Sequence, residues 1–355
     1  MLLEGANMLD RVGFSRVLAL CIVMATLTSM EYSLIDLIHS PNQSFFIETI
    51  TGILDGTPQW RAFANRLAGP YLVQAIHLCG FTYAQSLGIF YRLMFFLINI
   101  TAFLTVYFEK KDYKAGIFAA FSTTILMLVL QDPYFYTWDL IDVEIFYLLV
   151  FAINIGWPIY AYILIFIFEL ANREAALFIP FWLIINSLKL SVSPVEKRIR
   201  LSVESSASFL SGMIFSIVSI VYTEWIRKVN FKASFLGGIG EDVKHKSFGN
   251  HFNLVENLKH LFFSNWASSH FYVSSIVFFM LYWIIKYILL GDEIVRKKSI
   301  FVGSILLAII CFGLVNETRM YLILIPFFVD YCIQRYCVFV RQSSALPSEM
   351  KINIT

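Results

Sequence analysis

Residues 137–190 decide the fold of this chain; they read TWDLIDVEIFYLLVFAINIGWPIYAYILIFIFELANREAALFIPFWLIINSLKL. The pair Trp157-Pro158 interrupts the first apolar run, and the polar turn ELANREAA interrupts the second. About 20 apolar residues cross a bilayer as a helix, and fewer suffice where a helix is half-buried in protein. The stretch therefore predicts three short membrane helices, at 139–154, 157–171 and 174–190.

The composition extends this interpretation to the whole chain. Of the 355 residues, 58% are hydrophobic, 17% aromatic and only 15% charged, and the mean hydropathy is +0.70. These values exclude an ordinary soluble domain and predict an all-α, polytopic membrane protein. The five cysteines lie in or beside apolar runs without metal-ligand spacing. They indicate small apolar residues and no disulfide framework.

The apolar runs predict a transmembrane helical bundle of about ten spans, with re-entrant or interfacial helices in its outer loops. We expect one catalytic membrane domain over residues 1–340, outer loops at 32–83 and 224–270, and a polar cytoplasmic tail at 341–355. The expected spans are residues 14–31, 84–108, 114–131, 139–154, 157–171, 174–190, 206–223, 271–290, 299–315 and 319–340.

The distribution of lysine and arginine predicts the orientation. If both termini are cytoplasmic, ten spans place most basic residues of the short loops inside, as the positive-inside rule requires. Charges that violate both hydropathy and this bias are functional candidates. Five isolated arginines do so at or near the outer face: Arg61, Arg66, Arg92, Arg173 and Arg319.

Acidic residues accompany these arginines in the outer turns. Arginine binds phosphate with two parallel hydrogen bonds, and a nearby carboxylate can take a proton from a sugar hydroxyl that acts as nucleophile. A sugar linked to a lipid phosphate would use both groups. Aromatic residues near these turns could stack on sugar faces, or could form the interfacial aromatic belt. The acidic residues are Glu31, Asp36 and Asp55 in the first outer loop, Asp139 and Asp142 in the second, Glu174 in the third and Glu317 in the last.

Structural roles are alternatives at these positions. An interfacial helix could snorkel the charges of Arg61 and Arg66. Asp139 and Asp142 share one helix face, which suits either a shared cation or a pair of hydrogen-bond acceptors. Capping of the helix N-terminus is the structural alternative.

The turn Asn172-Arg173-Glu174 could instead form a structural ion pair. Glu317 and Arg319 stand two apart, so on one α-helix they would point in different directions. We therefore expect separate partners for them, a lipid phosphate for Arg319 and a neighbouring arginine such as Arg173 for Glu317.

Four short motifs resemble those of the polytopic GT-C-type glycosyltransferases and of bacterial inner-membrane proteins like them. The resemblance implies a polyprenyl-phosphate-linked sugar donor, an outward-facing active site and an acidic base in the first outer loop. That base would be Glu31, Asp36 or Asp55. The motifs are Arg66, Leu67, Gly69 and Pro70; Tyr136 and Asp139; Asn172, Arg173 and Glu174; and Glu317, Arg319 and Pro326.

The function expected from these features is transfer of a sugar from the polyprenyl-phosphate donor to a glycan or lipid-linked acceptor. No bound cofactor is expected, and a divalent cation is optional. The substrate-binding candidates are Arg61, Arg66, Asp139, Asp142, Arg173, Glu174, Glu317 and Arg319. Membrane lipids are expected partners, and nothing indicates nucleic acid. A lipid-linked oligosaccharide polymerase or ligase would use the same arginines, whereas a transporter or flippase would place polar residues at mid-bilayer.

The outer loop 224–270 holds four of the six histidines, with spacings that match no metal motif. Its NLVENLKHLFF segment predicts an amphipathic helix on the membrane surface, covering the substrate cleft.

Overall fold

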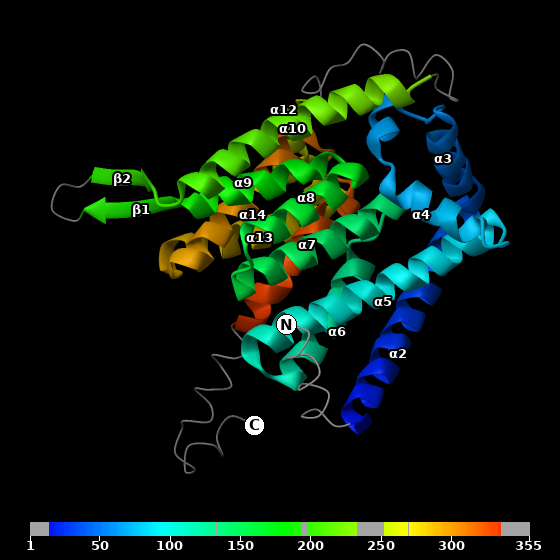
Figure 1. The fold of residues 1–355 in the computed structure, drawn as a ribbon, viewed down its shortest axis with the longest axis horizontal. Helices are drawn as coiled ribbons and strands as arrows, with labels where there is room; N and C mark the ends of the chain where they lie inside the picture. Colours follow the sequence, from blue (N-terminus) through cyan, green and yellow to red (C-terminus); the bar gives the residue numbers. More distant parts are fainter. Residues whose placement is uncertain (1–13, 133, 194–197, 233–251, 269, 335–355) are drawn as a thin grey trace.

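The computed structural model describes residues 14–132, 134–193, 198–232, 252–268 and 270–334, and over these ranges the chain is almost entirely helical (Figure 1). The predicted tail 341–355 and two of the loop histidines, His245 and His251, lie outside them. The first-half helices are α2 (Phe14–His39), α3 (Gln43–Asp55), α4 (Ala68–His77), α5 (Tyr83–Lys110), α6 (Tyr113–Val129), α7 (Thr137–Ile155) and α8 (Ile159–Asn172). The second-half helices are α9 (Phe178–Ser187), α10 (Ser206–Asn230), α12 (Leu254–Phe262), α13 (Phe271–Leu290) and α14 (Glu293–Phe312), and residues 325–334 are also helical.

Short elements join these helices. Strands β1 (Leu188–Ser193) and β2 (Arg198–Val203) form an antiparallel hairpin that projects from the bundle at the left of Figure 1. The 3-10 helices are η1 (Ser40–Asn42), η2 (Arg61–Asn65), η3 (Glu174–Leu177), η4 (Ser264–Ala267) and η5 (Thr318–Leu324). Helix α2 continues to His39, past the predicted end of the first span at residue 31, so Glu31 and Asp36 belong to a helix and not to a loop. Helices and 3-10 turns occupy much of residues 40–77, and their re-entrant or interfacial position stays a prediction.

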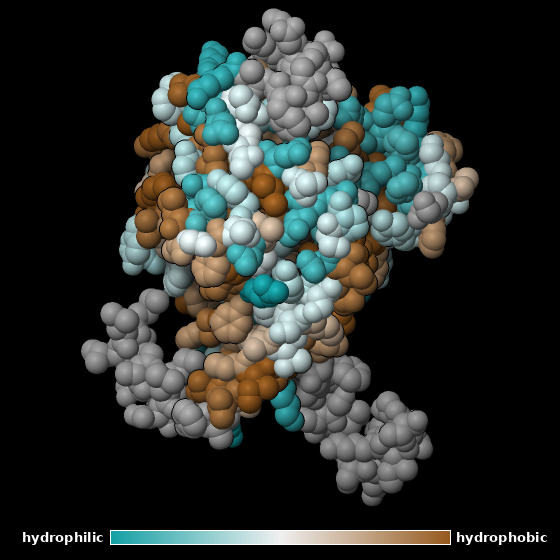
Figure 2. All heavy atoms as spheres, turned by 90° about the vertical axis from the view of Figure 1, so that its right-hand side faces the viewer, coloured by the Kyte–Doolittle hydropathy of each residue, from teal (hydrophilic) through white to brown (hydrophobic). Residues whose placement is uncertain are grey.

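Four helical segments of the described chain are long and apolar enough to cross a membrane: Arg16–Asp55, Tyr83–Lys110, Ser206–Asn230 and Phe271–Leu290. They agree with the predicted all-α membrane character. Shorter apolar helices cover Tyr113–Val129, Ile159–Asn172 and Glu174–Ser187. Hydrophobic side chains spread over the left side and lower part of the face in Figure 2, while hydrophilic ones gather toward its top.

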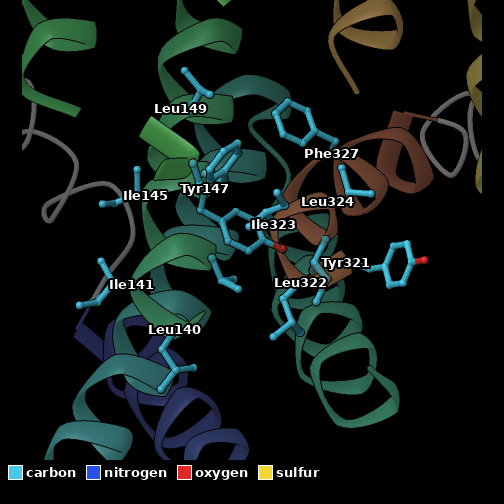
Figure 3. Packing of buried hydrophobic residues seen from close by; sticks show 14 of the residues in the cluster. Leu140, Ile141, Ile145, Tyr147, Leu149, Tyr321, Leu322, Ile323, Leu324 and Phe327 are labelled. Carbon is cyan, nitrogen blue, oxygen red and sulfur yellow. The ribbon is translucent and has the colours of Figure 1, made fainter. Parts of the chain in front are cut away.

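Helix α7 forms the centre of the core. It packs against α5, α8, α4 and η5, and its side chains Trp138, Leu140 and Phe146 are fully buried. Figure 3 shows Tyr147 of α7 among Leu322, Ile323 and other side chains of the C-terminal segment. The C-terminal end of α7 agrees with the predicted break at Trp157-Pro158, because Gly156 adopts a left-handed φ of 71° and caps the helix.

A glycine sets the distance between α4 and the start of α7. A Cβ atom on Gly69 would lie 2.3 Å from Oγ1 and 2.7 Å from Cβ of Thr137. No side chain fits there without displacing the first residue of α7. The glycine in the Arg66–Pro70 motif therefore allows the loop that carries Arg66 to lie against the N-terminus of α7.

The C-terminal end of α7 reaches a second polar cluster. Asn154 donates to Glu109 at 2.7 Å and to Asp330 at 2.9 Å, and Lys298 donates to Asp330 at 2.9 Å. Lys298 also donates to Asn154. Lys298 and Asp330 are buried, and these contacts tie α5, α7, α14 and the last described helix together.

Candidate functional site

Four arginines and the carboxylates that pair with them gather around the N-terminus of α7; we name them the arginine cluster. Arg66 follows η2, Arg173 joins α8 to η3, Arg227 lies in the last turn of α10, and Arg319 belongs to η5. Three of these were predicted from the sequence. Leu67, beside Arg66, donates its backbone N–H to the carbonyl of Ala171 at 3.0 Å, which fixes the first outer loop against the end of α8.

Arg173 is shared by the two aspartates of α7. Its Nη1 lies 2.7 Å from Oδ2 of Asp142 and 3.3 Å from Oδ1 of Asp139. Both carboxylates are almost completely buried, and they share a helix face because they are three residues apart. The shared cation is one of the two arrangements that the spacing predicted. It offsets two negative charges that would be costly to bury alone.

Asp139 has two further roles. It accepts a hydrogen bond from the backbone N–H of Tyr136 at 3.0 Å, so it also satisfies an open donor at the helix N-terminus. Its Oδ2 lies 3.4 Å from Nη1 of Arg319. Capping and ion pairing therefore occur together at this residue.

Glu317 and Arg319 contradict the expectation of separate partners. Arg319 Nη2 donates to Glu317 Oε2 at 2.8 Å. The reasoning from helical spacing was wrong here because the segment is not α-helical: Glu317 has an extended backbone, with φ −80° and ψ 95°, and η5 follows it. Among the described residues, no ion pair joins Glu317 to Arg173.

Glu174 joins two arginines from distant parts of the chain. Arg227 donates to Glu174 Oε1, and Arg66 Nη2 lies 3.9 Å from the same oxygen. Arg227 Nε also donates to Asn65 at 3.1 Å, and its Nη1 lies 3.5 Å from the partly exposed Glu224. The ion-pair interpretation of Glu174 thus holds, although Arg173 of the same turn pairs with other carboxylates.

Arg66 is the least hydrogen-bonded of the four arginines. It is 8% exposed, and its guanidinium lies 4.4 Å from the ring centre of Phe63 and 4.8 Å from that of Trp138. At 3.9 Å, Glu174 is too distant for a direct hydrogen bond. Burial lowers the pKa of the Arg66 guanidinium to about 10, although the charge of Glu174 acts in the opposite direction.

Several buried donors around the cluster have no hydrogen-bond partner among the residues described. Each is aimed into protein and not into bulk water, and a buried donor without a partner is costly. A ligand with several acceptor oxygens would satisfy them. These donors are the Nε atoms of Arg66, Arg173 and Arg319, Nδ2 of Asn65 and Nε1 of Trp138.

Sequence reasoning missed Arg227, Asn65 and Glu169. Arg227 was assigned to the long outer loop, but α10 continues to Asn230 and carries it into the cluster. Glu169 lies one turn before Arg173 and accepts a hydrogen bond from Asn172 at 3.4 Å; Asn172 also donates to Asp142 at 2.6 Å. The charge of Glu169 inside an apolar helix was a signal that could have identified it.

The three candidate bases of the first outer loop lie apart from one another. Glu31 is buried inside the bundle, where Asn99 donates to it at 3.2 Å. Asp55 is exposed at the end of α3. Asp36 is exposed near the end of α2 and lines a cavity together with Tyr32, His39, Gly88 and Tyr91. The side chain of Arg61 lies outside the described part of the structure.

Contacting aromatic rings connect this cavity to the arginine cluster. Phe46 lines the cavity and packs edge-on against Tyr136, with 5.7 Å between ring centres. Tyr136 in turn stacks on Trp138 at 4.3 Å, and the Arg319 guanidinium lies 4.9 Å from the Tyr136 ring centre. The cavity that Asp36 lines is thus linked to Arg319 through Phe46 and Tyr136.

Helix α12 agrees with the predicted amphipathic segment. Val255, Leu258 and Phe262 are exposed along it, while Asn257 and Leu261 are buried. It packs on α13, α14 and η4. Its predicted position over the substrate cleft stays a prediction.

No group of three or more His, Cys, Asp or Glu side chains with the arrangement of a metal site occurs among the residues described. Comparison with protein-family models, with curated proteins and with solved structures gives no significant match. The chemistry of the site is therefore inferred from its geometry.

Proposed function

We propose that this chain is a membrane glycosyltransferase of the GT-C type that takes a sugar from a polyprenyl-phosphate-linked donor. In this proposal the chain crosses the bacterial inner membrane ten times, both termini are cytoplasmic, and the arginine cluster lies at the outer face. The sugar passes to a glycan or lipid-linked acceptor. Donor headgroups lie at the depth where the polar ends of membrane helices meet the lipid phosphates.

The observation that carries the proposal is the state of Arg66. A buried guanidinium usually forms charge-assisted hydrogen bonds, often in parallel pairs to a carboxylate or phosphate. Among the described residues, the Arg66 guanidinium has only a 3.9 Å contact with Glu174 and two aromatic neighbours. A phosphate oxygen would complete its coordination. Asn65 and Arg319 offer further unpartnered donors in the same cluster.

The carboxylates of the arginine cluster preorganise the proposed phosphate site. Asp139, Asp142 and Glu174 hold the guanidinium groups in place before a ligand arrives, which reduces the ordering needed on binding. Glu317 and Glu224 are about one-third exposed. Their side chains can turn toward water when a phosphate replaces them as the partner of Arg319 or Arg227.

The proposed reaction is an inverting displacement. The Asp36 carboxylate takes the proton of an acceptor hydroxyl in the cavity, and the hydroxyl oxygen forms a bond to the anomeric carbon of the sugar. The bond between that carbon and the phosphate oxygen breaks, and its electron pair leaves with the polyprenyl phosphate. The arginines stabilise the added negative charge on this leaving group. The sugar would lie against the rings of Phe46 and Tyr136, between Asp36 and the arginines.

A binding experiment tests the phosphate site. Purified protein in detergent is titrated with polyprenyl phosphate and, separately, with the uncharged polyprenol, and thermal unfolding is followed. We expect polyprenyl phosphate to raise the Tm and polyprenol to leave it nearly unchanged. Arg66→Met should lose the shift, whereas Lys259→Met, which removes a cation from an exposed ion pair, should keep it. Equal shifts with both lipids, or an intact shift in Arg66→Met, would contradict the site.

Product analysis tests the reaction. In cells without the gene, the mass of the lipid-linked and surface glycans should fall by one sugar unit per acceptor. A loss of chain length with an unchanged repeating unit would instead identify a polymerase that uses the same arginines. Asp36→Asn at normal protein level should reproduce the loss.

A further inference from the structure

A second polar site lies inside the bundle, apart from the arginine cluster. Glu31 of α2 is 0% exposed, and so are Asn99 of α5 and Thr124 of α6. Asn99 Nδ2 donates to Glu31 Oε2 at 3.2 Å, and the hydroxyl of Thr124 donates to Oδ1 of Asn99 at 3.1 Å. Thr124 also lies 3.5 Å from Glu31 Oε2. These bonds orient the Glu31 carboxyl but bring no positive charge.

Two oxygen atoms at this site have no partner. Oε1 of Glu31 and Oγ1 of Thr28 are both buried, and no described residue forms a hydrogen bond with either. The two side chains are three residues apart on α2, so they lie on the same face of the helix. A buried carboxylate oxygen and a buried hydroxyl on one helix face are both available to bind a cation.

The charged and titratable groups around Glu31 do not neutralise it. In the described structure no lysine, arginine or histidine forms an ion pair with Glu31. Arg92 of α5 lies instead over the ring of Tyr32, 3.8 Å from its centre. The Tyr147 hydroxyl of α7 is near enough to interact electrostatically with Glu31, but it is uncharged and cannot neutralise the carboxylate. Other titratable groups on α2 and α6 include Asp36, which accepts from Tyr32, and Tyr113, which donates to the carbonyl of Arg16.

An isolated carboxylate is costly to bury in a membrane protein interior unless a positive charge compensates it. We propose that Glu31 and Thr28 form a buried site for one monovalent cation, either a proton or Na⁺. The carboxyl supplies the single negative charge, and the Thr28 hydroxyl supplies a neutral oxygen. Asn99 and Thr124 hold the carboxyl in position. The occupied site is electrically neutral.

Thermal unfolding of the purified full chain in detergent tests the site. The Tm is measured between pH 6 and 9, in NaCl and in choline chloride of equal ionic strength. If a proton occupies the site, the Tm of the wild type falls as the pH rises until the folded state loses this proton, because over that range the unfolded chain binds fewer protons than the folded one. If Na⁺ occupies it, NaCl raises the Tm at pH 8 and choline chloride does not.

Three variants distinguish cation binding at Glu31 from a general effect of pH or salt on stability. Glu31→Gln is neutral at every pH, so it should lose the pH or Na⁺ response, a difference from wild type of at least about 2 °C. Thr28→Val should weaken the Na⁺ response and leave the proton response intact. Glu48→Gln changes an exposed carboxylate and should behave as wild type. Equal pH and salt responses in wild type and Glu31→Gln overturn the proposal.

If Glu31→Gln does not fold, the Na⁺ response of Thr28→Val and infrared spectroscopy of the carboxyl groups test the proposal instead. A carboxylic acid band that disappears at high pH, and that Asn99→Leu shifts because it removes the hydrogen bond to Glu31, supports the proton. A Na⁺ response that Thr28→Val weakens supports the ion. The absence of both overturns the proposal.

Discussion

Arg319 donates a hydrogen bond to Glu317, two residues earlier in the chain, at 2.8 Å. The contact exists because the backbone of Glu317 is extended and a 3-10 helix begins directly after it. The same arginine reaches Asp139 on α7. A turn near the C-terminal end of the described chain thus contributes to a site built around a helix 180 residues earlier.

The two partners of Arg319 should respond differently to mutation. Glu317 is about one-third exposed, so Glu317→Gln should cost less than about 1 kcal/mol of unfolding free energy. Arg319→Met leaves the buried Asp139 with Arg173 as its remaining cation and should cost about 3 kcal/mol. Chemical denaturation in detergent measures both. Equal losses in the two variants would show that the buried pair has no special importance.

Gly69→Ala should destabilise the packing of the first outer loop against α7. The added Cβ would overlap the side chain of Thr137, and such overpacking typically costs about 1–3 kcal/mol. Thr137→Gly alone should also destabilise the protein. The double variant should recover part of the loss because the two changes act on one contact, as a double-mutant cycle reports. Gly80→Ala is unsuitable as a control because Gly80 has a φ of +98°, which alanine rarely adopts.

Removal of Lys298 should be strongly destabilising. Lys298→Met leaves Asp330 buried without its cation, and breaking a buried pair in this way costs about 3–5 kcal/mol. The double variant Lys298→Met/Asp330→Leu should regain much of that stability. Lys259→Met/Glu256→Leu, at an exposed pair, should change stability by less than about 1 kcal/mol in any combination. Additive losses at the buried pair would contradict the coupling.

The ring of Tyr136, and not its hydroxyl, should matter for Arg319. The guanidinium lies 4.9 Å from the ring centre, and a buried cation–π contact contributes about 1–2 kcal/mol. Tyr136→Phe should therefore retain stability and polyprenyl phosphate binding, while Tyr136→Leu should lower both. A loss in Tyr136→Phe equal to that in Tyr136→Leu would assign the effect to the hydroxyl.

Hydropathy and helix-breaking residues predicted much of the fold. The break at Trp157-Pro158 separates α7 from α8, and the expected span 271–290 coincides with α13. Hydropathy and helix breaks depend on residues close together in the chain, so they can be recognised in the sequence. The α-helical spacing assumed for Glu317 and Arg319 was wrong because a 3-10 turn depends on packing against α7 that no local pattern reveals.

The site could be predicted only in part for the same reason. Isolated charges in apolar surroundings identified Arg66, Arg173 and Arg319, because such charges are costly wherever the chain folds. Arg227 was missed because its partners, Asn65 and Glu174, are far from it in sequence. Which of Glu31, Asp36 and Asp55 lines a cavity also depends on tertiary packing.

The three acids near the start of α7 have a consequence for biogenesis. Asp139, Asp142 and Glu144 lie in its first eight residues, and such residues strongly disfavour insertion of a single helix into a bilayer. α7 cannot be expected to partition into lipid as soon as it is synthesised. It should wait at the insertion machinery until Arg173, 31 residues beyond Asp142, has been made and can enter with it. Assembly of the membrane domain would then proceed by insertion of a helical hairpin.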